Sequence, residues 1–259
     1  MSDIWEGMFV NEYELLNIAT SIGKRMMECG AEIYRVEESI LRMCQAYGLP
    51  QVDVFAIPTS IVVTIGTEDG RFLTRTKRVY TRGNDLDKLD QFNDLCRHIC
   101  KEKMSYEQAR TKADAIEHRP TYSLWGKMFA HMLASVAFCF FFGGNAQDAT
   151  VSATIGAMIF FLSRTINLLE PNPFLNTLIS SAVSACMAFG AVQIGWGINM
   201  DKIIIGPLML LVPGITITNS MRDIIAGDFL TGWTKVVEAF LMAAGIALGT
   251  MVPLSLLGG

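Results

Sequence analysis

The sequence predicts an α-helical membrane protein in which a five-helix transmembrane bundle follows a small cytoplasmic α+β domain. The first observation is uneven charge: residues 1–123 hold 16 of the 21 lysines and arginines and 19 of the 25 aspartates and glutamates. The rest is far poorer in charge than an ordinary soluble domain, in which about 25% of residues are charged. The second is a series of long apolar runs in that stretch, and the third is a Pro213-Gly214 break within one of them. The charge step near Arg119 therefore divides the chain into domains 1–118 and 119–259.

The polar domain begins with two helical patterns. Apolar residues recur every three or four positions across 12–29 and 31–48, and Gly30 separates the two segments. Three strand-like runs follow, at 52–57, 61–65 and 71–79. The connector between the first two is too short for a parallel crossover, which predicts an antiparallel hairpin. Two further helical patterns cover 84–104 and 106–118.

The apolar domain contains five runs that are long enough to cross a bilayer. They cover about 124–143, 149–168, 174–197, 203–220 and 231–257. About 20 residues at 1.5 Å each span a hydrocarbon core of about 30 Å. Small residues in the third run and the Gly245/Gly249 pair in the fifth predict close packing into a bundle.

Basic residues near these runs predict the orientation, because cytoplasmic loops are enriched in lysine and arginine. Positive residues mark the approach to the first run and also the second and fourth connections, whereas the loop 144–148 and the tail after Met251 have none. This pattern predicts a cytoplasmic N-terminus and a C-terminus outside, and Lys202 alone departs from it.

Several classes of function are disfavoured. The net charge of −4 disfavours nucleic-acid binding, because domains that bind nucleic acid are usually basic. No P-loop, GxGxxG motif or nucleophile elbow occurs in the sequence. The N-terminal Met1–Glu6 lacks the basic and apolar regions of a secretory signal. Cys96 and Cys100 share a helix face, but His98 points away, so two half-buried cysteines are favoured over a metal site. We therefore expect no enzyme activity, no cofactor and no metal.

The Pro213-Gly214 break is the strongest candidate for a functional site. An interrupted helix is tolerated in a bilayer only where protein or water satisfies its freed backbone groups, and transporters place substrate and ion sites there. Beyond the break, Asn219, Arg222 and Asp223 fall at i, i+3 and i+4 and so share one helix face. The alternative is a proline kink followed by ordinary interfacial polar residues.

Other ionisable residues in the apolar domain are also candidates, since charge inside a membrane is costly. Glu238 lies about 10 Å into the fifth run, where Lys235 could pair with it. His131, near the middle of the first run, suits a proton relay, although a hydrogen bond to a neighbouring helix is the simpler role. Asp228 precedes a new helix and could act as its N-cap.

Three blocks of the sequence resemble the threonine/serine exporter family of bacteria and fungi. They are Gly30–Glu37, Val52–Thr59, and Leu211–Gly214 with the polar residues that follow as far as Asp228. The resemblance is to the N-terminal half of the longer members and so implies the split, two-component type, in which a second small membrane protein supplies the other half. A split pair of this type is associated with succinate export. The resemblance implies a multi-pass protein of the bacterial inner membrane.

We therefore predict a subunit of a secondary exporter for threonine/serine-type amino acids or dicarboxylates, working in the lipid bilayer with a second subunit or as a homo-oligomer. Pro213, Gly214, Asn219 and Arg222 are expected to bind substrate. Asp223, Glu238, Asp228 and His131 are expected to couple protons or to gate. The alternatives are a membrane-anchored enzyme and a signalling scaffold that uses residues 1–118.

Overall fold

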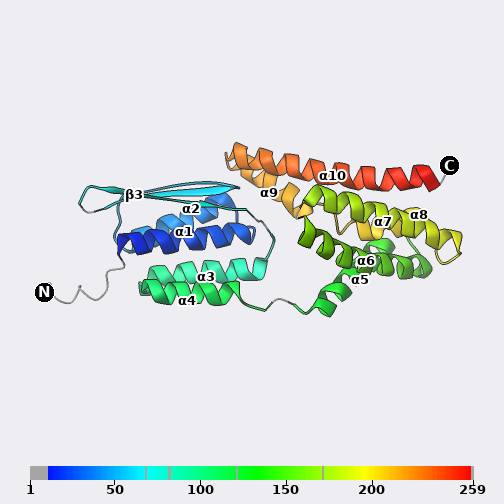
Figure 1. The fold of residues 1–259 in the computed structure, drawn as a ribbon, viewed down its shortest axis with the longest axis horizontal. Helices are drawn as coiled ribbons and strands as arrows, with labels where there is room; N and C mark the ends of the chain where they lie inside the picture. The colour runs from blue at the N-terminus through cyan, green and yellow to red at the C-terminus, as the bar shows by residue number, and fades with distance from the viewer. Residues whose placement is uncertain (1–10, 68, 81–82, 121, 171, 258–259) are drawn as a thin grey trace. The chain divides into compact units, whose positions relative to one another are not determined.

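The computed structural model describes residues 11–67, 69–80, 83–120, 122–170 and 172–257. Its internal contacts divide the chain into two compact units, one ending at Pro120 and the other covering the remainder. Figure 1 shows the elements of each unit.

The N-terminal unit consists of three layers, as Figure 1 shows. Its elements are α1 (Glu12–Glu28), α2 (Ile33–Ala46), β1 (Val52–Ile57), β2 (Ser60–Gly66), β3 (Phe72–Arg78), α3 (Leu86–Glu102) and α4 (Tyr106–Glu117). The sheet has the order β1-β2-β3 and is antiparallel throughout, which confirms the predicted hairpin. One sheet face packs on α1 and α2, and these helices contact α3 and α4 in turn.

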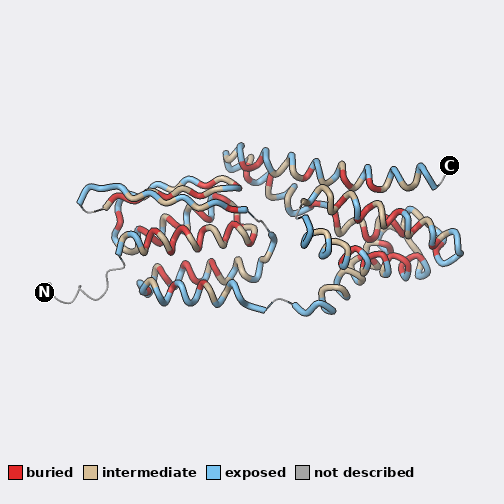
Figure 2. Tube along the Cα trace, viewed as in Figure 1, coloured by how far each residue is buried: buried red, intermediate tan, exposed pale blue. Residues whose placement is uncertain are grey.

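The core of this unit follows the predicted periodicities. Buried Ile22 and Met26 of α1 are four residues apart, as are Val36 and Ile40 of α2. Alternate residues of β2 are buried, whereas Phe55 of β1 lies exposed on the outer face of the sheet. The helices and β2 therefore appear as striped segments of buried and exposed residues in Figure 2.

The second unit is entirely helical in the part that the structure describes. Its elements are α5 (Leu124–Phe141), α6 (Ala146–Leu169), α7 (Pro173–Gln193), α8 (Met200–Leu208), α9 (Gly214–Ile225) and α10 (Phe229–Leu257). Four of these helices, α5, α6, α7 and α10, are long and apolar enough to cross a membrane.

The predicted fourth run, 203–220, is not one continuous helix. It forms the 9-residue α8 and the 12-residue α9, each too short to cross a bilayer by itself, so the predicted count of five spanning helices is not confirmed. Pro207 near the end of α8 has no amide hydrogen, and the chain turns over residues 209–213 before α9 begins.

The predicted close packing of small residues is found between α7 and α10. A Cβ atom at Gly249 would lie 2.0 Å from Ser181 Oγ, and one at Gly245 would lie 2.5 Å from Thr177 Oγ1. These two glycines therefore allow the backbone of α10 to approach α7 directly.

Candidate functional site

The interruption between α8 and α9 leaves polar backbone groups at the start of α9. The N–H of Gly214 donates to Val212 O (2.8 Å), and that of Ile217 donates to Pro213 O (3.0 Å). Among the described residues, the N–H groups of Ile215 and Thr216 have no hydrogen-bond acceptor, and no side chain caps this end. Such a helix start favours an anionic group, because its free N–H groups and the helix dipole both point toward it.

The three polar residues beyond the break differ in exposure although they lie on one helix. Asn219 is half-buried, Arg222 is exposed and Asp223 is only 2% exposed. Asp223 lies nine positions after Gly214, which is about 14 Å along the helix axis. The structure therefore places the predicted anion-binding end and the predicted proton-coupling carboxylate at opposite ends of α9.

Asp223 forms a buried ion pair with Lys235 of α10. Lys235 Nζ lies 2.7 Å from Asp223 Oδ2, and the two side chains are 16% and 2% exposed. Lys235 thus reaches across to the preceding helix, to a partner that the sequence did not suggest. Loss of one partner from a buried pair strands a charge and typically costs about 3–5 kcal/mol.

A tight corner between α9 and α10 places these two charges together. Gly227 adopts φ = +92°, its N–H donates to Ile224 O, and the N–H of Asp228 donates to Asp223 O (2.9 Å). These are the paired hydrogen bonds of a Schellman helix ending, which requires a left-handed residue at the position of Gly227. Asp228 Oδ1 then accepts from the N–H of Thr231 (3.4 Å), which is the capping role left open by the sequence.

Two buried hydroxyl groups near this ion pair were missed by the sequence reasoning. Ser220 of α9 is 1% exposed and donates to Ile217 O, whereas Thr231 of α10 is fully buried. Thr231 Oγ1 has no hydrogen-bond partner among the described residues. Because Thr231 precedes Lys235 by four residues, both side chains lie on one face of α10. This four-residue spacing is visible in the sequence and could have indicated that the two side chains lie together.

His131 is held by other contacts. His131 Nδ1 is 2.9 Å from Lys127 O of its own helix, and its ring centroid lies 5.1 Å from that of Phe160 on α6. The neighbouring-helix contact of His131 is therefore aromatic. Glu238 is half-buried one turn beyond Lys235, and neither Glu238 nor Arg222 is without a partner.

Asp148, which the sequence reasoning did not single out, is a buried carboxylate whose hydrogen bonds join two helices. It is fully buried and accepts hydrogen bonds from four donors. They are the backbone N–H groups of Asn145 (3.2 Å), Ile198 (2.8 Å) and Asn199 (3.0 Å) and the side-chain amide of Asn199 (2.8 Å). Asp148 therefore fastens the start of α6 to the start of α8, and so fixes the segment that leads to the break.

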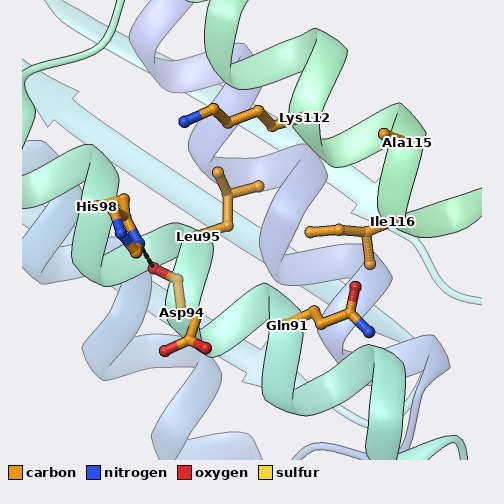
Figure 3. A pocket seen from close by; sticks show the side chains of 7 residues that line it. All are labelled: Gln91, Asp94, Leu95, His98, Lys112, Ala115 and Ile116. Atoms are coloured by element: carbon orange, nitrogen blue, oxygen red, sulfur yellow. Dashed lines mark hydrogen bonds between the residues drawn. The ribbon is translucent and has the colours of Figure 1, made fainter.

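The N-terminal unit has a shallow groove of about 320 Å³ between α3 and α4 (Figure 3). It is lined by Gln91, Asp94, Leu95, His98, Lys112, Ala115 and Ile116. Within it, His98 Nδ1 bonds to the backbone carbonyl of Asp94 (2.9 Å). Cys96 lies elsewhere, buried against Met26, and desolvation raises its pKa to about 12. No group of three metal-ligating side chains occurs among the described residues.

A family model and two curated proteins match most of this chain. A family model described as "Putative threonine/serine exporter" matches residues 17–257. A "Probable threonine/serine exporter" of Mycobacterium tuberculosis is 23% identical over 243 residues, which are 93% of this chain and 46% of that protein. A "Threonine/serine exporter" of Corynebacterium glutamicum is 22% identical over 242 residues, which are 91% and 50%. The chain thus spans about half the length of the curated relatives it matches, and no solved structure matches it.

Proposed function

The chain belongs to the threonine/serine exporter family, and on this premise we propose that it is one subunit of a secondary exporter of small carboxylate-bearing metabolites. The substrates are threonine/serine-type amino acids or dicarboxylates such as succinate. The observation that carries the proposal is the buried Asp223–Lys235 pair beside an interrupted helix in a multi-pass membrane protein. Charged pairs in membrane segments are costly and mark proton and substrate pathways.

In this mechanism, the two ends of α9 have different tasks. The free N–H groups of Ile215 and Thr216 at the start of α9 bind a substrate carboxylate, and the exposed Arg222 near its other end is the alternative carboxylate site. Asp223 carries the coupling proton, because protonation removes its attraction for Lys235 and loosens the contact between α9 and α10. Glu238 and Thr231 lie on the α10 side of this contact, where they accept or relay the released proton.

A second membrane subunit completes the transporter, with assembly of identical chains as the alternative. The curated relatives are about twice as long as the stretch that they share with this chain. The helices also differ in burial. In the most apolar 18-residue stretch of each helix, 44% of α6 and 39% of α7 are buried, but only 11% of α5 and 11% of α10. The apolar outer faces of α5 and α10 are therefore available to lipid and to a second subunit.

The test is an efflux assay in bacteria that express the chain with and without a candidate second subunit. Cells loaded with a threonine-containing dipeptide, or grown to accumulate succinate, should lose one of these solutes faster only when both subunits are present. Full export by the purified monomer alone would rule out the two-component arrangement. Unchanged efflux of every carboxylate tested, with both subunits in the membrane, would rule out the exporter.

A further inference from the structure

We infer that the N-terminal unit binds a phosphate oxyanion between β3 and α1, at a site formed by Arg75 and Lys77 with Lys24 and Arg25 beside them. This site is independent of the proposed transport, because it lies in the other unit of the chain and uses none of the residues of α9 or α10.

The first argument is the register of β3. Arg75 and Lys77 are two residues apart, so both side chains lie on the same face of the strand. In the sheet they pair with Val63 and Ile61, which are fully buried. Both cations therefore lie on the face that packs on helices, and α1 is the helix that contacts β3.

The second argument is that the guanidinium groups of Arg75 and Arg25 are held in place, although each has a nitrogen that donates no hydrogen bond among the described residues. Arg75 Nη1 donates to Tyr13 Oη (3.1 Å), and the guanidinium carbon lies 5.6 Å from the centre of that ring. Arg75 Nε and Arg25 Nη1 are both buried, and neither has a hydrogen-bond partner among the described residues. A buried donor without an acceptor is costly, so an anion that reached either nitrogen would relieve that cost.

The third argument is the charge environment of Lys77. Among the described residues, Lys77 makes no ion pair, and its charged neighbours of greatest influence are the cations Arg75, Lys24 and Arg25. Burial and then these neighbours lower the pKa of Lys77. A bound anion would raise the pKa of Lys77, because its negative charge offsets the charges of the neighbouring cations.

Nearby carboxylates do not neutralise the cluster. Arg25 Nη2 contacts Asp114 Oδ1 (2.5 Å) and Glu117 Oε2 (3.0 Å), and Lys24 pairs with Glu28 (3.2 Å). These three carboxylates are thus engaged by the cations of α1. Among the described residues, Arg75 and Lys77 make no ion pair with a carboxylate, and an arginine with a lysine beside it matches the several acceptor oxygens of phosphate.

The ligand is a phosphate group that is either free in solution or part of a phospholipid headgroup. The test is calorimetric titration of the purified full chain in detergent with inorganic phosphate, at constant ionic strength set with chloride. Soluble dihexanoyl phosphatidic acid is titrated in parallel, with dihexanoyl phosphatidylcholine as the zwitterionic reference. Tighter binding of phosphatidic acid than of phosphate assigns a headgroup, and the reverse order assigns a free phosphate.

The variant pair is Lys77→Gln with Arg78→Gln as its matched control, because Arg78 is the next residue and lies on the opposite face of β3. Lys77→Gln should weaken phosphate binding at least tenfold, and Arg78→Gln should leave it within twofold of the unmodified chain. As a second readout, ¹³C-dimethylated Lys77 followed by NMR should show a higher pKa when phosphate is added. No phosphate binding by the unmodified chain, or equal losses in the two variants, would overturn the site.

Discussion

At the scale of single residues, the proposed mechanism depends on the cost of an unpaired charge away from water. Asp223 and Lys235 attract one another more strongly in a low-dielectric interface than they would in solution, and each compensates for the desolvation of the other. In the proposed cycle, a proton on Asp223 leaves Lys235 without its counter-charge. The free-energy cost of the unpaired Lys235 charge can then be coupled to movement of α9 against α10.

Substitution of Arg222 tests whether this side chain, which follows the Pro213-Gly214 break, binds a substrate carboxylate. Arg222→Lys keeps the charge but loses the planar two-point geometry that arginine offers to a carboxylate. We expect efflux to fall by more than tenfold at equal expression. Asp228→Asn is the control, because asparagine also caps helices and should reduce efflux much less. Near-normal efflux from the lysine variant would remove Arg222 from the substrate site.

Substitution of Asp148 tests whether its hydrogen bonds hold α8 against α6. Asp148→Ala removes the acceptor of four hydrogen bonds, and each donor left buried and unpaired costs about 1–3 kcal/mol. We expect a marked loss of thermal stability in detergent, measured by the melting temperature. Asp201→Ala is the matched change at an exposed aspartate and should shift the melting temperature little. Equal shifts in the two variants would show that Asp148 does not fasten α8 to α6.

At the scale of helices, the glycines of α10 provide a direct test of the contact with α7. Gly249→Ala would place a methyl group within 2.0 Å of Ser181 Oγ and 2.3 Å of Leu178 O, so α10 must move away. Gly190→Ala in α7 is the control, because its new methyl group meets no atom within 4 Å and alanine favours a helix by about 1 kcal/mol. Only the Gly249 variant should be less stable in a thermal-unfolding assay. An equally stable Gly249 variant would contradict the close contact.

The pair α8–α9 decides the side of the membrane on which the chain ends. At 1.5 Å per residue the two helices add to about 32 Å, enough for one interrupted crossing of a core of about 30 Å. An interrupted crossing predicts a reporter that is active in the cytoplasm after Met104 and outside the cell after Leu257. Cytoplasmic activity at both points would mean that only the four long helices cross.

The local patterns predicted most elements but could not fix how distant residues meet. The periodicity of α1 and α2 and the hairpin of β1 and β2 were readable, since each depends on neighbours in sequence. The Gly245/Gly249 pair predicted a close helix contact, but only the fold shows that the contact is with α7. The Pro213-Gly214 break was visible, yet the resulting pair of short helices was read as part of one span. The partner of Asp223 was missed because the corner at Gly227 brings Lys235 back toward it, which only the folded chain reveals. Asp148 was missed for a similar reason, because three of its four donors lie about 50 residues away.

At the scale of the whole molecule, the two units carry different kinds of chemistry. The N-terminal unit is an α+β domain with a cationic site between α1 and β3, and its groove between α3 and α4 has no role in the proposed transport. The membrane unit holds the interrupted helix and the buried ion pair. The chain matches about half of each curated relative, and the second set of helices belongs to the proposal above.

The most direct test of the central claim is efflux from cells that carry Asp223→Asn, Lys235→Met or both changes, together with the second subunit. Each single change should destabilise the membrane unit, because it strands the opposite charge. The double change removes both charges and should recover normal expression and melting temperature, while efflux stays at the level of cells without the transporter. The double change Asp201→Asn with Lys202→Met, at an ion pair that is 70% and 36% exposed, should leave efflux unchanged. Wild-type efflux from the stable Asp223→Asn/Lys235→Met double variant would show that the buried pair is structural alone, and would contradict its proposed role in export.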